Sequence, residues 1–153
     1  MSLFKRRKCS VRQVVGSVFL ILTSIPTAQA DSQSDNNALL TIERLKDSVV
    51  DRLASCETKG RPDADSVVVV DTNNEASIGR LQFQPNTVVN YTKLFEGRSI
   101  DRREAIQIAS NGQRASELAK RIIFEKDGVG NWHVCSKKMG LVPEIKVIQW
   151  MMK

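Results

Sequence analysis

The segment LLTIERLKDSVVDRLASCE, residues 39–57, repeats apolar side chains at the three- and four-residue spacing of an α-helix. Charged residues stand between these positions, so the pattern predicts an amphipathic helix of about twenty residues. Gly60 and Pro62 follow, and neither favours continuation of a helix, so the helix is expected to end near Cys56 and Glu57. The apolar positions are Leu39, Ile42, Leu45, Val49 and Leu53.

The chain after this helix predicts a small β-hairpin followed by shorter helices. Residues 66–70 form a β-branched run, residues 76–83 suit a second strand, and the pair Asn73-Asn74 between them is favourable for a turn. Further helices are expected at about 85–94, 102–110, 112–128 and 134–139, the second of them with the capping-box spacing of Asp101 and Glu104. This order predicts a mostly helical α+β domain.

The first thirty residues have the three zones of a removable signal peptide. Basic residues at 5–8 precede an apolar run at 14–25, and Ala28-Gln29-Ala30 supplies a cleavage site. The run is shorter than the roughly 20 residues that span a bilayer, so we expect cleavage and no stable membrane anchor; an uncleaved anchor is the alternative. We therefore divide the chain into a signal peptide (1–30), a flexible mature N-terminus (31–37) and one domain (38–153), exported to the periplasm or secreted.

Removal of the signal changes the charge balance. The segment carries five of the 23 basic residues and none of the 17 acidic ones, so 18 basic and 17 acidic side chains remain. The net charge of +6 therefore belongs mostly to the export signal. Without the basic export signal, the charge of the remaining chain gives no electrostatic reason to expect a nucleic-acid partner.

Two cysteines remain after the signal, at Cys56 and Cys135. An even pair in an oxidising compartment favours a disulfide, with two separate buried thiols as the alternative. A bond that closes a loop of about eighty residues stabilises a domain by roughly 4–5 kcal/mol in the chain-entropy model. His133 is the only histidine, and no cluster at ligand spacing predicts a metal site or another cofactor.

Glu57 is the first candidate for chemistry, because it ends the long helix, follows a cysteine and opens a turn that leads to the hairpin. A half-buried carboxyl group at such a place has a raised pKa and can donate a proton. A solvated carboxylate at a helix end is the alternative interpretation.

Two segments resemble the motifs of the soluble lytic transglycosylases of the lysozyme-like superfamily. Residues 57–66, ETKGRPDADS, are similar to the Glu-Ser-x-x-x-Pro-x-Ala-x-Ser motif of that family, and residues 79–87, GRLQFQPNT, to its Gly-Leu-Met-Gln-Ile-x-Pro-x-Thr motif. Ser110-Asn111-Gly112 is a weaker match to a third motif, Tyr-Asn-x-Gly. The chain differs from the family pattern at Thr58, Arg80 and Ser110.

The resemblance implies a lysozyme-like domain with a small β-hairpin beside a sugar cleft. It also implies that Glu57 is the single catalytic acid/base and that the partner is the glycan strand of peptidoglycan, cleaved by a monomer between N-acetylmuramic acid and N-acetylglucosamine. The substrate-binding residues carried over are Ser66, Ser77, Gln82 and Asn111.

Other functions stay open at this point. A hydrolytic lysozyme would need a second carboxylate, for which Asp65, Asp71 and Glu75 are candidates. A lysozyme-like binding protein without activity and a small exported interaction module are further alternatives. Trp132 is either a core aromatic or a surface for sugar stacking, and the apolar tail at 145–152 either packs on the core or contacts a partner.

Overall fold

The computed structural model describes residues 29–70, 72 and 74–153. Residues 1–28 of the predicted signal peptide therefore lie outside the described residues, as do Asp71 and Asn73 of the predicted hairpin turn. The longest element is helix α1 (Gln29–Glu57), which ends at the predicted residue. Its last third carries the buried side chains of Val49, Val50, Leu53 and Ala54, each no more than 2% exposed.

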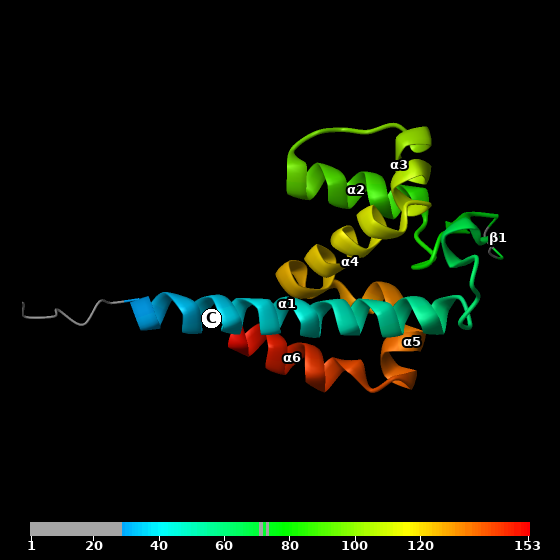
Figure 1. The fold of residues 1–153 in the computed structure, drawn as a ribbon. Helices are drawn as coiled ribbons and strands as arrows, with labels where there is room; N and C mark the ends of the chain where they lie inside the picture. The colour runs from blue at the N-terminus through cyan, green and yellow to red at the C-terminus, as the bar shows by residue number, and fades with distance from the viewer. Residues whose placement is uncertain (1–28, 71, 73) are drawn as a thin grey trace, which may run out of the picture.

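The first turns of α1 differ from the sequence-based expectation. Residues 31–37, expected as a flexible mature N-terminus, lie within the helix, which begins about ten residues before the apolar pattern. No glycine or proline interrupts residues 29–57, and extending a helix that packing has already formed costs little. Figure 1 shows this part of α1 projecting beyond the helices that pack on the rest.

The predicted hairpin is present and short. Strands β1 (Val68–Val70) and β2 (Ala76–Ile78) pair antiparallel, with Val69 opposite Ser77, after the 3₁₀ turn η1 (Ala64–Ser66). Ile78 forms a further bridge to Phe83, so the intervening residues make a tight turn and not a continuing strand. Gly79 begins this turn at φ 73°, and a Cβ there would lie 2.0 Å from the carbonyl oxygen of Ala109, so only glycine fits.

Three helices follow the hairpin close to the predicted positions: α2 (Pro85–Glu96), α3 (Arg102–Ala109) and α4 (Gly112–Lys126). The carboxylate of Asp101 accepts a hydrogen bond from the backbone N–H of Glu104 at 2.7 Å and so caps α3 as expected. Helix α4 packs on α1, and α2 and α3 pack on α4.

The C-terminal part of the chain contains the 3₁₀ turn η2 (Gly128–Trp132) and helices α5 (His133–Lys138) and α6 (Leu141–Met151). The apolar tail is part of α6 and packs on α1, with Ile145 and Ile148 each 1% exposed. Arg52 of α1 and Glu144 of α6 form an ion pair at 2.5 Å across this contact. The tail thus packs on the core through Ile145 and Ile148, while the side chains of Val147, Trp150, Met151 and Met152 are exposed.

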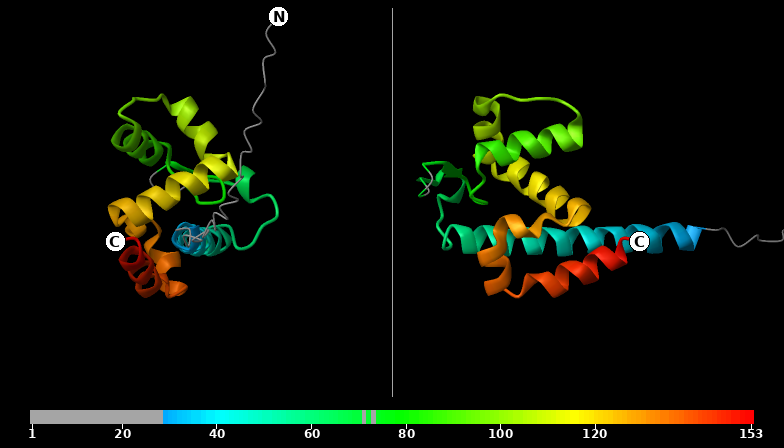
Figure 2. Two further views of the ribbon diagram at one scale, coloured as in Figure 1. Left: turned by 60° about the vertical axis from the view of Figure 1, so that its left-hand side comes forward. Right: turned by 180° about the vertical axis from the view of Figure 1, so that it is seen from behind.

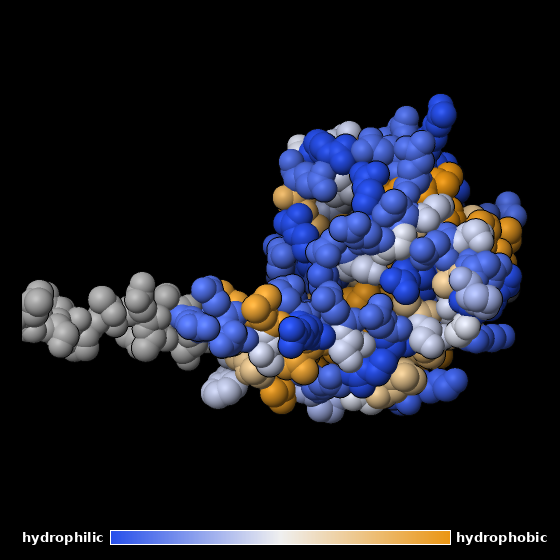
Figure 3. Space-filling model, viewed as in Figure 1, coloured by the Kyte–Doolittle hydropathy of each residue, from blue (hydrophilic) through white to orange (hydrophobic). Residues whose placement is uncertain are grey.

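The whole arrangement places α1 between two groups of elements. Figures 1 and 2 show α4, with α2 and α3 beyond it, on one side of α1 and α6 on another, while the hairpin lies past the C-terminal end of α1. This is the mostly helical α+β domain that the sequence predicts. Figure 3 shows a largely hydrophilic face with apolar surface at the hairpin, where Val68, Val69 and Val70 are exposed. In the part of the chain that the structure describes, no helix combines the length and the apolar character that crossing a membrane requires.

The packing of α6 on α1 can be tested with a matched pair of substitutions. Ile145→Ala is expected to lower the free energy of unfolding by about 2–5 kcal/mol, because it leaves a cavity in the core. Val147 lies on the same helix but is 57% exposed, so Val147→Ala is expected to change it by less than about 0.5 kcal/mol. Urea unfolding followed by circular dichroism measures both; equal, small effects would contradict the packing.

Candidate functional site

The C-terminal end of α1 is held by a regular pattern of backbone hydrogen bonds. The N–H of Gly60 donates to the carbonyl of Ser55 at 2.8 Å, and the N–H of Lys59 donates to that of Cys56 at 3.3 Å. These two bonds form a Schellman motif, in which Lys59 takes the left-handed position with φ 54°. The buried hydroxyl of Thr58 also donates to the carbonyl of Ala54 at 2.8 Å. The backbone around Glu57 is therefore fixed.

A disulfide adds a covalent restraint at the same place. The Sγ atoms of Cys56 and Cys135 are 2.06 Å apart, with a Cα–Cα distance of 5.8 Å, so the last turn of α1 is bonded to α5. The bond confirms the pairing that the two cysteines predict. It joins segments that are 79 residues apart in the sequence.

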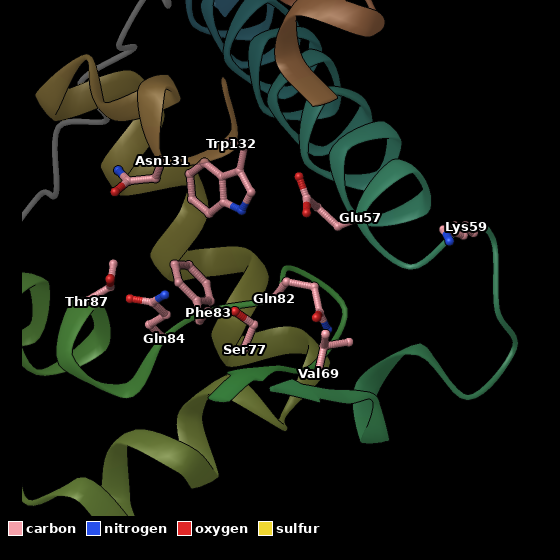
Figure 4. Close-up of a pocket in the computed structure, with 10 residues that line it drawn as sticks. All are labelled: Glu57, Lys59, Val69, Ser77, Gln82, Phe83, Gln84, Thr87, Asn131 and Trp132. Atoms are coloured by element: carbon pink, nitrogen blue, oxygen red, sulfur yellow. The ribbon is translucent and has the colours of Figure 1, made fainter. Parts of the chain in front are cut away.

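A pocket of about 560 Å³ opens beside this helix end. Its walls come from the end of α1, the hairpin, the turn that follows β2, the start of α2, and η2 (Figure 4). The lining side chains are those of Glu57, Lys59, Val69, Ser77, Gln82, Phe83, Gln84, Thr87, Asn131 and Trp132.

Glu57 reaches this pocket from the last position of α1. Its side chain is half-buried, and burial raises the pKa of the carboxyl group above its usual value because the charged form loses solvation. Among the described residues that line the pocket, Glu57 is the only acid. The group is thus both accessible and biased towards the protonated form.

Two aromatic side chains form the wall opposite Glu57 in Figure 4. Phe83 and Trp132 meet edge to face, with ring centroids 5.3 Å apart and an interplanar angle of 72°. The indole N–H of Trp132 donates to the carbonyl of Leu81 at 2.8 Å, and the side chain is 4% exposed. Trp132 is therefore a buried core aromatic, as the first of the two alternatives expects, and only a small part of its ring reaches the pocket.

Gln82 and Ser77 are the two predicted substrate-binding residues that join Glu57 in the pocket. Gln82 lies in the turn between Ile78 and Phe83, at φ 50°, and its amide NH₂ donates to the carbonyl of Gly79 at 2.7 Å. Ser77 lies on β2 and is 8% exposed. The two segments that carry Glu57 and Gln82 are separated in the sequence but form one site.

Ser66 and Asn111 do not line this pocket. The Ser66 hydroxyl donates to the backbone carbonyl of Asp63 at 2.9 Å on an exposed 3₁₀ turn. The Asn111 side chain accepts a hydrogen bond from the N–H of Arg114 at 3.0 Å and caps α4. Serine and asparagine commonly make such local bonds to the backbone, which is why their presence in a motif does not by itself place them in a site.

Two of the three candidate second carboxylates, Asp65 and Glu75, are not among the lining residues, and the third, Asp71, lies outside the described residues. Asp65 pairs with Arg80 at 3.5 Å, and Glu75 pairs with Arg102 at 3.3 Å. Arg80, which departs from the family motif, also approaches Asp51 of α1 at 3.7 Å. Arg80 therefore links the turn that carries Gln82 to α1 and to η1, outside the pocket.

The sequence did not single out several residues of the pocket. Phe83, Gln84 and Thr87 fall inside the second motif, so their place in it was an available signal. Lys59 likewise falls inside the first motif, whereas Asn131 carried no such signal. Asn131 donates through its amide to the carbonyl of Gly128 at 2.7 Å, a contact that only the fold reveals. The described residues contain no group of three or more His, Cys, Asp or Glu side chains placed to hold a metal ion.

Comparison of the chain with models of known protein families, with curated proteins and with solved structures finds no match.

The raised pKa of Glu57 predicts a pH dependence of stability. As pH rises above the ordinary glutamate value of about 4.3, the unfolded chain loses this proton before the folded chain does. Between the ordinary glutamate pKa and the raised pKa of Glu57 in the folded chain, the free energy of unfolding therefore decreases as pH rises. Above the raised pKa the decrease is complete. Glu57→Gln removes the effect, so the free energy of unfolding of the variant minus that of the wild type should increase with pH.

Urea unfolding at several pH values measures this difference, and ¹³C NMR titration of the Glu57 carboxyl measures the pKa itself. Burial does not act on Glu57 as described if two results are found together. The difference in free energy of unfolding between Glu57→Gln and the wild type does not change with pH, and the NMR titration gives a pKa at or below the ordinary pKa of glutamate.

Proposed function

We propose that the chain is an exported lytic transglycosylase that cleaves the bond between N-acetylmuramic acid and N-acetylglucosamine in peptidoglycan, with Glu57 as its acid/base. The observation that carries the proposal is the meeting of Glu57 and Gln82 in one pocket. Each belongs to one of two separate segments that resemble the family motifs. The half-burial of Glu57 supports the same assignment, because it is the environment that a proton-donating carboxyl group needs.

The first chemical step assigned to Glu57 is general acid catalysis. The protonated carboxyl gives its proton to the glycosidic oxygen as the bond from that oxygen to C1 of the muramic acid breaks and positive charge develops on the sugar ring. A raised pKa favours this step, since it increases the fraction of Glu57 that still holds its proton near neutral pH.

The second step returns a proton to Glu57. The carboxylate left by the first step removes the proton from the 6-hydroxyl of the same muramic acid, and the hydroxyl oxygen bonds to C1. The products are a 1,6-anhydromuramic end and a free 4-hydroxyl, with no water consumed. This step needs no second carboxylate, in contrast to the double-displacement and water-activating mechanisms of other glycosidases.

The remaining walls suit a carbohydrate. Phe83 and Trp132 are 2% and 4% exposed, so they offer a sugar ring a small apolar contact, and the amides of Gln82 and Asn131 offer polar groups for its hydroxyls. The disulfide supports an oxidising compartment, and the signal-like N-terminal sequence supports export. Both agree with a substrate that lies outside the cytoplasmic membrane.

The reaction can be tested by incubating purified peptidoglycan with the protein lacking residues 1–30 and identifying the released muropeptides by mass spectrometry. The wild type is expected to release anhydro products. Glu57→Gln should release them at least about a hundredfold more slowly, because it removes the general acid. Glu125→Gln is the matched control, since Glu125 lies on α4, pairs with Arg121 and does not line the pocket, and it should retain full activity.

Three other results would replace the proposal. Hydrated products would assign a hydrolytic lysozyme, and binding without products would assign an inactive glycan-binding protein. Neither binding nor cleavage would leave an exported interaction module whose Glu57 has no catalytic role.

A further inference from the structure

Lys59 brings a positive charge to the same pocket, and the chemistry proposed for Glu57 does not use it. Its side chain is exposed and lines the pocket two residues after Glu57. Lys59 forms no ion pair within 4.0 Å with any carboxylate of the described residues. The other charged group of the lining is Glu57 itself.

The positive charge of Lys59 does not act to stabilise the ionised form of Glu57. A neighbouring ammonium group would lower the pKa of a carboxyl group, whereas the pKa of Glu57 is raised, with burial as the cause. Figure 4 shows Lys59 at one end of the pocket and Asn131 towards the other, with Glu57 between them. The ammonium group is thus placed to meet a part of the ligand that lies beyond the bond facing Glu57.

The backbone does not explain a lysine at this position. Lys59 has φ 54°, the left-handed conformation that ends a Schellman motif and that glycine adopts most easily. A glycine would suit the helix end better, and the next residue, Gly60, is one. The remaining local explanation is a favourable interaction of the ammonium group with the C-terminal end of the α1 dipole, which predicts an effect on stability alone.

We propose that Lys59 binds a carboxylate on a substituent of the glycan, so that the preferred ligand is a peptide-substituted, anionic glycan strand and not the bare polysaccharide. The inference rests on the proposed function for the identity of the glycan. In peptidoglycan the substituent is the peptide stem, whose free carboxylates project from the muramic acid. Lys59 is accordingly a specificity-determining residue at one end of the pocket, and Glu57 is the reacting group.

The test uses soluble, uncross-linked peptidoglycan strands in two forms: native, and with the stem carboxylates converted to amides by carbodiimide and ammonia. The two forms share glycan and stem length and differ in charge. Binding is measured by fluorescence anisotropy of labelled strands in the Glu57→Gln background, where cleavage does not interfere. Three proteins are compared in this background: one that keeps Lys59, one with Lys59→Arg and one with Lys59→Gly. The Tm of each is measured as a check on folding.

With Lys59 present, the native strands are expected to bind about two- to fivefold more tightly than the amidated strands, the effect typical of one exposed ion pair. The preference should decrease at high ionic strength and persist in Lys59→Arg. In Lys59→Gly the two forms should bind equally, with Tm unchanged or higher because glycine suits the backbone.

An equal affinity of the Lys59 protein for both forms would overturn the inference. So would a preference that survives in Lys59→Gly, or an equal loss of binding to both forms. These results are distinct from failure of the proposed function, which is decided by the products that the wild type releases. A protein that cleaves both forms equally well keeps its function and loses this role of Lys59.

Discussion

The disulfide between Cys56 and Cys135 fixes the geometry on which the site depends. It bonds the turn that ends in Glu57 to α5, whose sequence begins directly after Trp132. The indole of Trp132 in turn donates a hydrogen bond to Leu81, the residue before Gln82. The segment 132–135 therefore connects the two walls of the pocket, one through a covalent bond and one through a buried hydrogen bond. A shift of either wall has to strain or break one of these two connections.

This restraint permits a carboxyl group to occupy an environment that does not suit its charged form. Burial raises the pKa of Glu57, so the ionised group lowers the stability of the folded chain at neutral pH. In the chain-entropy model this disulfide stabilises the domain by roughly 4–5 kcal/mol, and the packed face of α1 adds to this. Burial is only partial, so a ligand can still reach the carboxyl group, and the same partial burial keeps its proton available for transfer.

The sequence predicts the parts of this structure that have local signals. Gly60 and Pro62 predict the end of α1, Asp101 predicts the cap of α3, and an even pair of cysteines predicts the disulfide. The start of α1 was not predicted, because polar residues without glycine or proline give no boundary. Ser66 and Asn111 were assigned to the site from motif position, but each forms a local backbone hydrogen bond elsewhere. Asn131 joins the pocket only through the tertiary arrangement, whereas Lys59 lies two residues after Glu57 in the sequence.

The central claim is that the bond to be cleaved lies against Glu57 in the pocket between the hairpin and Trp132. A crystal structure of the Glu57→Gln variant with a bound tetrasaccharide of alternating N-acetylglucosamine and N-acetylmuramic acid tests it most directly. The account predicts a sugar ring against Phe83 and Trp132 and a bridging glycosidic oxygen within hydrogen-bonding distance of the side chain at position 57. A tetrasaccharide bound on another surface, or bound in this pocket with no glycosidic oxygen near position 57, would contradict the account.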